Sequence, residues 1–185
     1  MALSAKIFKV NLQITDMDRN YYAEHLLTLA RHPSETDQRM MVRLLAFALH
    51  ADEQLGFTKG LCADEEADLW QISLSHEIEL WIDVGLPDER RVRKACNRAQ
   101  RVYLYSYGGR GADLWWQKNG GKLKRFTNLT VIEVPETACK EMTNLVQRSM
   151  QLQCTVQDGE IWLSSSEQTC SISPLIRQSE APLSS

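Results

Sequence analysis

The order of elements between residues 68 and 107 constrains the fold more than any other feature of this sequence. The spacing of apolar residues predicts strands at 68–74 and 78–84, a helix at 87–100 and a strand at 102–107. The first two strands have a short connection, so we expect an antiparallel pair. Strands joined through a helix need a crossover connection, and part of the sheet must therefore be parallel.

The remaining sequence predicts further elements on both sides of this unit. Ser34 and the acidic residues after it are typical of a helix start, and apolar side chains recur on one face through residue 51. The other predictions are strands at 4–14, 127–134, 152–157 and 161–164, and helices at 112–118 and 135–150. Residues 21–30 fit either a strand or a helix, and the nearby strand as a hairpin partner favours the strand. Residues 52–67 are predicted as a loop, and the Asp158–Gly159 pair predicts a hairpin turn.

One domain accounts for this pattern, because a chain of 185 residues suits a single core. Residues 1–173 are predicted to form an α/β (mixed α+β) domain, a mixed β-sheet flanked by helices with additional β-hairpins. Residues 174–185 are predicted to form a loose polar tail. No run approaches the roughly 20 apolar residues of a membrane span, and the N-terminus does not resemble a signal peptide. We therefore expect a cytoplasmic protein with no membrane partner and with a monomer as the default state.

Composition and motifs exclude several functional classes. The formal net charge of −3 disfavours a strongly basic nucleic-acid-binding domain, although it is compatible with a local basic patch. No Gly-rich phosphate loop, HExxH, GxSxG or CxxC motif occurs, which disfavours the common nucleotide, zinc and triad sites. The cysteines are odd in number and widely spaced, which predicts reduced thiols: Cys62, Cys96, Cys139, Cys154 and Cys170.

Two aspartates lie where chemistry is possible. Asp68 begins the first strand of the predicted pair, and Asp83 lies near the end of the second. These positions are neighbours in an antiparallel pair, so the two carboxylates can converge on a hard cation such as Mg²⁺. The alternative is that Asp68 caps a turn and Asp83 faces water. The residues alone favour this alternative.

Longer segments resemble the YaeQ family over nearly the whole chain, and only the polar tail departs from it. The segments are ARHPSET at 30–36, RMMVRLLAFALHADE at 39–53, FTKGLCADEE at 57–66, ELWIDVGLPDERRVRKAC at 79–96, WW at 115–116 and VQDGEIWLS at 156–164. That family is similar in fold to the restriction-endonuclease-like superfamily of PD-(D/E)XK nucleases. The resemblance implies a core of helix, strand hairpin, helix and strand at about residues 34–134.

The resemblance also implies a metal site of the nuclease type. Asp68 matches the first acid of the motif, with Ala67 in place of the expected proline, and Asp83 matches the second acid. Gly85 stands where the motif has a lysine. In some relatives that lysine lies on the following helix, which implies Lys94 as the stabilising cation.

Helical geometry bears on the role of Lys94. At about 100° per residue, Lys94 points roughly 150° from the centre of the apolar stripe of its helix. The same row contains Arg90, Arg98 and Arg101. A solvated face explains this row more economically than a catalytic site does. Arg91 lies closer to the flank of the stripe and is a candidate contact for nucleic acid.

The first helix offers a further acid. In the superfamily an acid on this helix often joins the metal site, which implies Glu35. Arg39 and Arg43 share its predicted helix face and are the expected nucleic-acid contacts there. The alternative is an i,i+4 ion pair between Glu35 and Arg39, which would contribute about 0.2–0.5 kcal/mol.

Two functions remain open. The first is phosphodiester hydrolysis dependent on Mg²⁺ or Mn²⁺, in which Glu35, Asp68 and Asp83 hold the ion and Lys94 stabilises charge. The second is a non-catalytic module that binds nucleic acid or protein and retains a nuclease-like fold. The pair of acids favours the enzyme, whereas Gly85 favours the binding module.

Four tryptophans could stack on bases, but such residues more often fill a core: Trp70, Trp81, Trp115 and Trp116.

Overall fold

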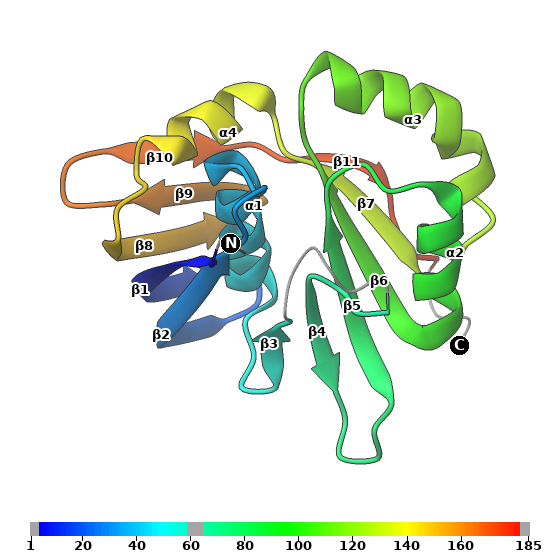
Figure 1. Ribbon diagram of the computed structural model, residues 1–185, viewed down its shortest axis with the longest axis horizontal. Helices are drawn as coiled ribbons and strands as arrows, with labels where there is room; N and C mark the ends of the chain where they lie inside the picture. The colour runs from blue at the N-terminus through cyan, green and yellow to red at the C-terminus, as the bar shows by residue number, and fades with distance from the viewer. Residues whose placement is uncertain (1–3, 59–64, 182–185) are drawn as a thin grey trace.

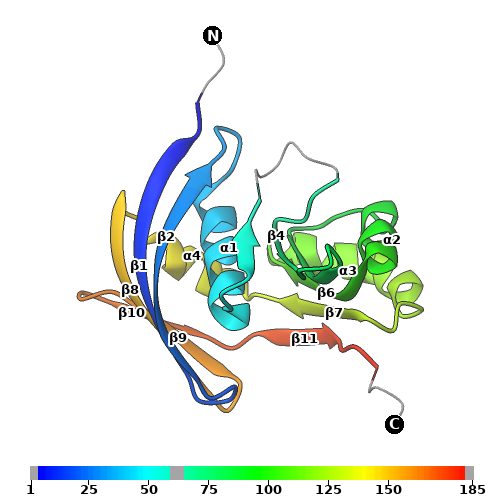
Figure 2. The same cartoon turned by 90° about the horizontal axis from the view of Figure 1, so that it is seen from below.

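The computed structural model describes residues 4–58 and 65–181, and in these ranges it has four helices and two mixed β-sheets. The helices are α1 (Asp37–His50), α2 (Glu89–Arg98), α3 (Arg110–Leu123) and α4 (Glu136–Thr143). Figures 1 and 2 show α1 and α4 between the two sheets, and α2 and α3 on the outer side of the second sheet. The mixed α and β class is confirmed, with two sheets instead of the one predicted.

The first sheet, here called sheet A, is built from both ends of the chain. Its strands are β1 (Lys6–Asp16), β2 (Tyr21–Arg31), β8 (Ser149–Gln157), β9 (Glu160–Ser164) and β10 (Thr169–Ile172), in the order β10-β9-β8-β1-β2. Asp158 and Gly159 have φ of 52° and 78° and form the predicted turn between β8 and β9. Strands β1 and β8 pair in parallel and so join the two hairpins.

The second sheet, sheet B, contains the unit that the sequence predicts best. Its strands are β3 (Leu55–Phe57), β4 (Leu69–Ile72), β5 (Ile78–Val84), β6 (Ala99–Ser106), β7 (Leu129–Glu133) and β11 (Leu175–Gln178), in the order β11-β7-β6-β5-β4-β3. Strand β4 pairs antiparallel with β5, and β5 pairs in parallel with β6 across α2. Both pairings confirm the prediction.

The edge strands of sheet B correct two predictions. Strand β11 lies in the segment predicted as a loose tail and pairs antiparallel with β7. Arg177 fixes it there by donating to Glu133 Oε2 at 2.8 Å. Strand β3 lies in the predicted loop 52–67 and pairs antiparallel with β4. Gly60 of that loop lies outside the described residues. Both strands are three or four residues long, too short for a periodic signal, and the neighbouring strand fixes them.

Helix boundaries also differ from the prediction. The helix predicted at 34–51 begins after Thr36, whose hydroxyl accepts the backbone N–H of Arg39 at 3.1 Å, so Glu35 precedes the helix. The helix predicted at 135–150 ends at Thr143, because the chain must extend again to form β8 beside β1. Helix α3 is longer than the predicted 112–118 segment.

Helix α1 is buried on nearly every side, because sheet A covers one of its faces and sheet B covers the other. Two polar side chains of α1 are enclosed with it. Arg43 is only 3% exposed. His50 is partly buried, its Nε2 lies 2.6 Å from the Tyr105 hydroxyl, and its ring packs edge-on against Tyr103. The single sheet predicted from the sequence would have covered only one face of α1.

The outer face of sheet B forms a second core against α2 and α3, which includes Trp81, Val92 and Leu104.

The cysteines are packed free thiols where the structure describes them: Cys96, Cys139, Cys154 and Cys170. Burial raises the pKa of Cys154 to about 12. Cys62 lies outside the described residues. Among residues 4–58 and 65–181, no helix is long and apolar enough to cross a membrane.

Candidate functional site

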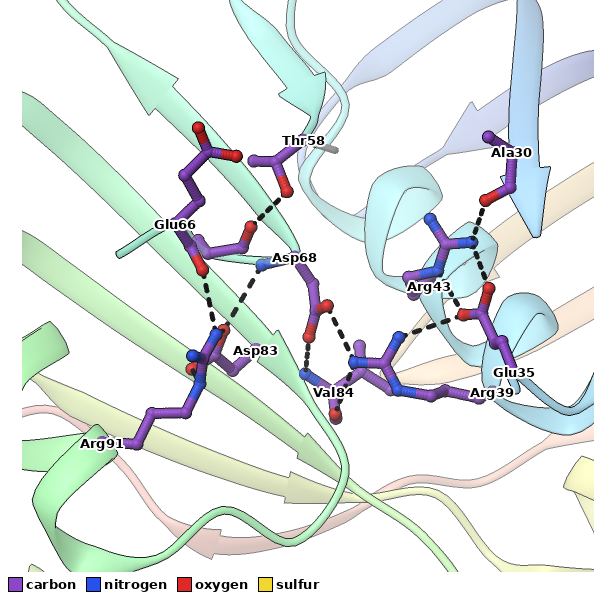
Figure 3. A network of polar contacts seen from close by, with 11 residues as sticks. Ala30, Glu35, Arg39, Arg43, Thr58, Glu66, Asp68, Asp83, Val84 and Arg91 are labelled. Atoms are coloured by element: carbon purple, nitrogen blue, oxygen red, sulfur yellow. Dashed lines mark hydrogen bonds and ion pairs between the residues drawn. The ribbon is translucent and has the colours of Figure 1, made fainter. Parts of the chain in front are cut away.

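The three acids proposed as metal ligands lie near one another at the edge where β4 and β5 face α1 (Figure 3). Asp68 immediately precedes β4, Asp83 lies near the end of β5, and Glu35 lies just before α1. All three are buried, with exposures of 6%, 4% and 6% respectively. Charges buried this deeply require partners.

Glu35 is bound by two arginines of α1. Arg43 donates from Nε to Oε1 at 2.7 Å and from a terminal nitrogen to Oε2 at 2.8 Å, which is the bidentate geometry of strong arginine–carboxylate pairs. Arg39 donates to Oε1 at 3.0 Å. Arg43 also donates to the carbonyl of Ala30 at 3.1 Å, so this pair ties the loop before α1 to the end of β2.

Asp68 shares Arg39 with Glu35. The second terminal nitrogen of Arg39 donates to Asp68 Oδ1 at 2.7 Å and to the carbonyl of Val84 at 3.2 Å. The backbone N–H of Val84 donates to Asp68 Oδ2 at 2.8 Å. Burial alone lowers the pKa of Arg39, but the adjacent carboxylates of Asp68 and Glu35 outweigh it and raise that pKa. Arg39 therefore stays charged and bridges two acids.

Asp83 is bound from the other side of sheet B. Arg91 of α2 donates from Nε to Oδ2 at 2.8 Å and from a terminal nitrogen to Oδ1 at 2.9 Å. Oδ1 also lies 3.3 Å from the backbone N–H of Asp68, which makes the two aspartates neighbours. Burial raises the pKa of Asp83, and the carboxylate of Asp68 raises it further, while Arg91 lowers it.

The carboxylates, as arranged, do not fit a metal site. Each of the six oxygens of Glu35, Asp68 and Asp83 accepts at least one hydrogen bond. Asp68 turns to an arginine of α1, and Asp83 turns to an arginine of α2 on the opposite face of sheet B (Figure 3). Within residues 4–58 and 65–181, no three His, Cys, Asp or Glu side chains are grouped as metal ligands. A divalent ion would have to displace arginines from these acids.

The backbone explains the glycine at the expected lysine position. Gly85 has φ of 121°, a conformation that residues with a Cβ rarely adopt, so a lysine here would be strained. The proposed substitute, Lys94, contacts the carboxylate of Glu65. Glu65 is highly exposed, and Arg98 donates to its carbonyl at 2.6 Å. The structure thus places Lys94 in a contact on the outer side of α2.

A groove lies beside this contact. Its lining is Glu65, Asp88, Arg90, Arg91 and Lys94, and its volume is about 350 Å³. We call it the cationic groove, because three positive side chains face two negative ones. Asp88 accepts the backbone N–H of Arg91 at 2.9 Å and so caps α2, which fixes the start of the helix at the groove.

The three predicted nucleic-acid contacts have different positions. Arg39 and Arg43 are held inside by Glu35, and Arg43, at 3% exposure, offers almost no surface to a ligand. Arg91 is 28% exposed and lines the cationic groove while it binds Asp83. The bridging role of Arg39 was not predicted from the sequence. The i,i+4 spacing from Glu35 was a signal for the first half of that bridge, but no local pattern indicated the second half at Asp68.

Comparison with known proteins identifies the family. The family model described as YaeQ protein matches residues 1–174. The chain is 49% identical over 164 residues to the uncharacterized protein YaeQ of Escherichia coli (strain K12), covering 89% of this chain and 91% of that one. The corresponding protein of Salmonella typhi is 48% identical with the same coverage.

Two solved structures agree with this match. The crystal structure of the YaeQ protein from Xanthomonas axonopodis pv. citri has a TM-score of 0.92 and 47% identity, covering 97% of this chain and 100% of that chain. The YaeQ protein from Pseudomonas syringae has a TM-score of 0.91 and 31% identity, covering 95% and 97%. The resemblance in the sequence segments is thereby confirmed, and the chain belongs to the YaeQ family.

Proposed function

We propose that this chain is a non-catalytic nucleic-acid-binding protein with a restriction-endonuclease-like core, and that it binds the phosphodiester backbone at the cationic groove. The observation that carries the proposal is the convergence of Arg90, Arg91 and Lys94 on one open groove at the start of α2. Guanidinium and ammonium groups are the usual protein partners of phosphate oxygens.

The surface around the groove adds positive charge. Arg98 of α2 is exposed and donates to the carbonyl of Glu65, a residue that lines the groove. Together with Arg90, Arg91 and Lys94 it forms a local basic patch, although the whole chain has a net charge of −3. A local patch of this kind binds phosphate weakly and in a salt-dependent way, because each contact releases counterions from the nucleic acid.

The acid network supports binding without hydrolysis. The acids that the nuclease resemblance nominates neutralise Arg39, Arg43 and Arg91 and hold α1 and α2 against the sheet. The acids therefore have a structural role in this proposal. Such a role does not need a lysine at the position of Gly85. The antiparallel β4–β5 pair, α2 and the parallel strand β6 have the order expected of an endonuclease-like core, which supports the fold part of the proposal.

The proposal is tested by charge reversal in the groove. We expect Arg90→Glu/Lys94→Glu to weaken binding of a fluorescein-labelled 20-nucleotide DNA by roughly tenfold or more at low salt. We also expect the slope of log K against log salt to become shallower by about 1.4, since two phosphate contacts of about 0.7 each are lost on a single strand. Fluorescence anisotropy between about 50 and 200 mM salt measures both quantities, in EDTA and in Mg²⁺.

The control is Lys122→Glu/Lys140→Glu, which changes the net charge equally at two exposed lysines of α3 and α4. We expect it to bind like the wild type. Equal losses in both double variants would reject the groove as the binding site. Cleavage of the DNA in Mg²⁺ would instead favour the metal-dependent hydrolase.

A further inference from the structure

We infer that an apolar groove beside the cationic groove accepts an unpaired base, so that the preferred ligand is a single-stranded nucleic acid. This inference rests on the proposed function and specifies its ligand. The second groove has a volume of about 360 Å³. Its apolar walls are Leu86, Pro87, Leu114 and Trp115, and we call it the apolar groove.

The two grooves share a wall. Asp88 lines both of them, so they meet at the start of α2. A ligand that places a phosphate beside Arg90 can therefore place a neighbouring group in the apolar groove. In single-stranded nucleic acid that neighbouring group is a base with an exposed face, whereas in a duplex the base faces are covered by stacking.

The apolar walls are accessible and held in position before a ligand binds. Leu86 and Leu114 are 41% and 54% exposed, so both walls are accessible to a ligand. The indole N–H of Trp115 donates to the carbonyl of Pro87 at 2.8 Å, so α3 is tied to the loop after β5. The two walls of the groove are thereby fixed relative to each other.

Polar groups at the rim suit a nucleotide. Lys118 is exposed and lines the apolar groove, where it can pair with the next phosphate. Asn119 donates from its side-chain nitrogen to the carbonyl of Trp115 at 2.9 Å, and this bond positions its amide at the wall. An apolar groove flanked by cations on both sides matches alternating bases and phosphates better than it matches an apolar peptide.

The test compares ligands with the same phosphates and different bases. Three fluorescein-labelled probes of equal length are used: a single-stranded DNA, an abasic strand and a duplex. We expect the wild type to bind the single strand at least about tenfold more tightly than the abasic strand, because base stacking on such walls contributes at this scale. The affinity of the wild type for the duplex, divided by its two strands, should be no higher than the affinity for the abasic strand.

Two variants locate the effect. Leu86→Ser/Leu114→Ser should reduce single-strand binding to the abasic level and leave abasic binding unchanged. Both side chains are exposed, so folding should be preserved, as a thermal melt will show. The matched control is Leu26→Ser/Leu74→Ser, at two leucines that are 81% and 94% exposed elsewhere. It should retain the preference for the single strand.

The two proposals fail separately. Equal wild-type affinity for the single strand and the abasic strand would overturn the base site and leave phosphate binding in place. The base site would also be overturned if Leu86→Ser/Leu114→Ser still bound the single strand more tightly than the abasic strand. No binding of any probe would overturn the proposed function and this inference together.

Discussion

Glu35→Gln should lower the free energy of unfolding by about 3–5 kcal/mol, the usual cost of breaking a buried ion pair by removing one partner. Arg43 has a side chain that is 4% exposed and donates two hydrogen bonds to Glu35. A neutral amide keeps the shape of the side chain but leaves the buried guanidinium without a counterion. Urea unfolding at pH 7 measures the difference.

The control is Glu65→Gln, because Glu65 also contacts two cations, Lys94 and Arg98, but is highly exposed. Water screens such surface pairs, so the unfolding midpoint should stay within error of the wild type. If both variants shift the midpoint equally little, the acid network does not stabilise the fold. A weak i,i+4 ion pair between Glu35 and Arg39 would then be enough to explain the role of Glu35.

The second large effect is a loss of stability in mild acid that depends on His50. Burial is the largest cause that lowers the pKa of His50, and together with the charges of Arg19 and Arg101 it brings that pKa to about 3. The unfolded chain binds a proton near pH 6.5, whereas the folded chain keeps His50 neutral. The stability is therefore complete above pH 6.5 and is lost as the pH falls toward 3. Between pH 6.5 and 5 we expect a loss of about 2 kcal/mol.

His50→Gln should flatten this pH dependence, since glutamine can still bond to the Tyr105 hydroxyl but does not titrate. Urea unfolding at pH 7, 6 and 5 measures the slope. His25→Gln is the matched control on β2 and should keep the wild-type slope, because His50 is still present. A wild-type slope in the His50 variant would show that other groups cause the acid sensitivity.

The parts of the fold set by local patterns could be predicted from the sequence. The strand, strand, helix, strand unit around Asp83 follows from apolar spacing and from the short connections between its elements. The pairing of β1 with β8 could not be predicted, because it joins segments at opposite ends of the chain. The burial of both faces of α1 follows from that second sheet, and so was missed as well.

The candidate site was predicted in position but not in its chemistry. The antiparallel pairing places the backbone N–H of Asp68 beside Asp83 Oδ1, but the two carboxylates bind arginines on opposite faces of sheet B. Which cation neutralises each acid depends on where α1 and α2 place Arg39 and Arg91, and this is a tertiary property. A buried acid and a metal-binding acid have the same sequence signature, because both are carboxylates within apolar strands.

The most direct test of the arginine-neutralised network is the thermal unfolding midpoint of the wild type as Mn²⁺ is added. A ligand that binds only the folded state raises the midpoint in a saturable way. Because guanidinium groups already occupy the three acids, we predict that the midpoint does not change up to millimolar Mn²⁺. A saturable rise that disappears in Asp83→Asn would contradict this, and would show that Asp83 binds metal in preference to Arg91.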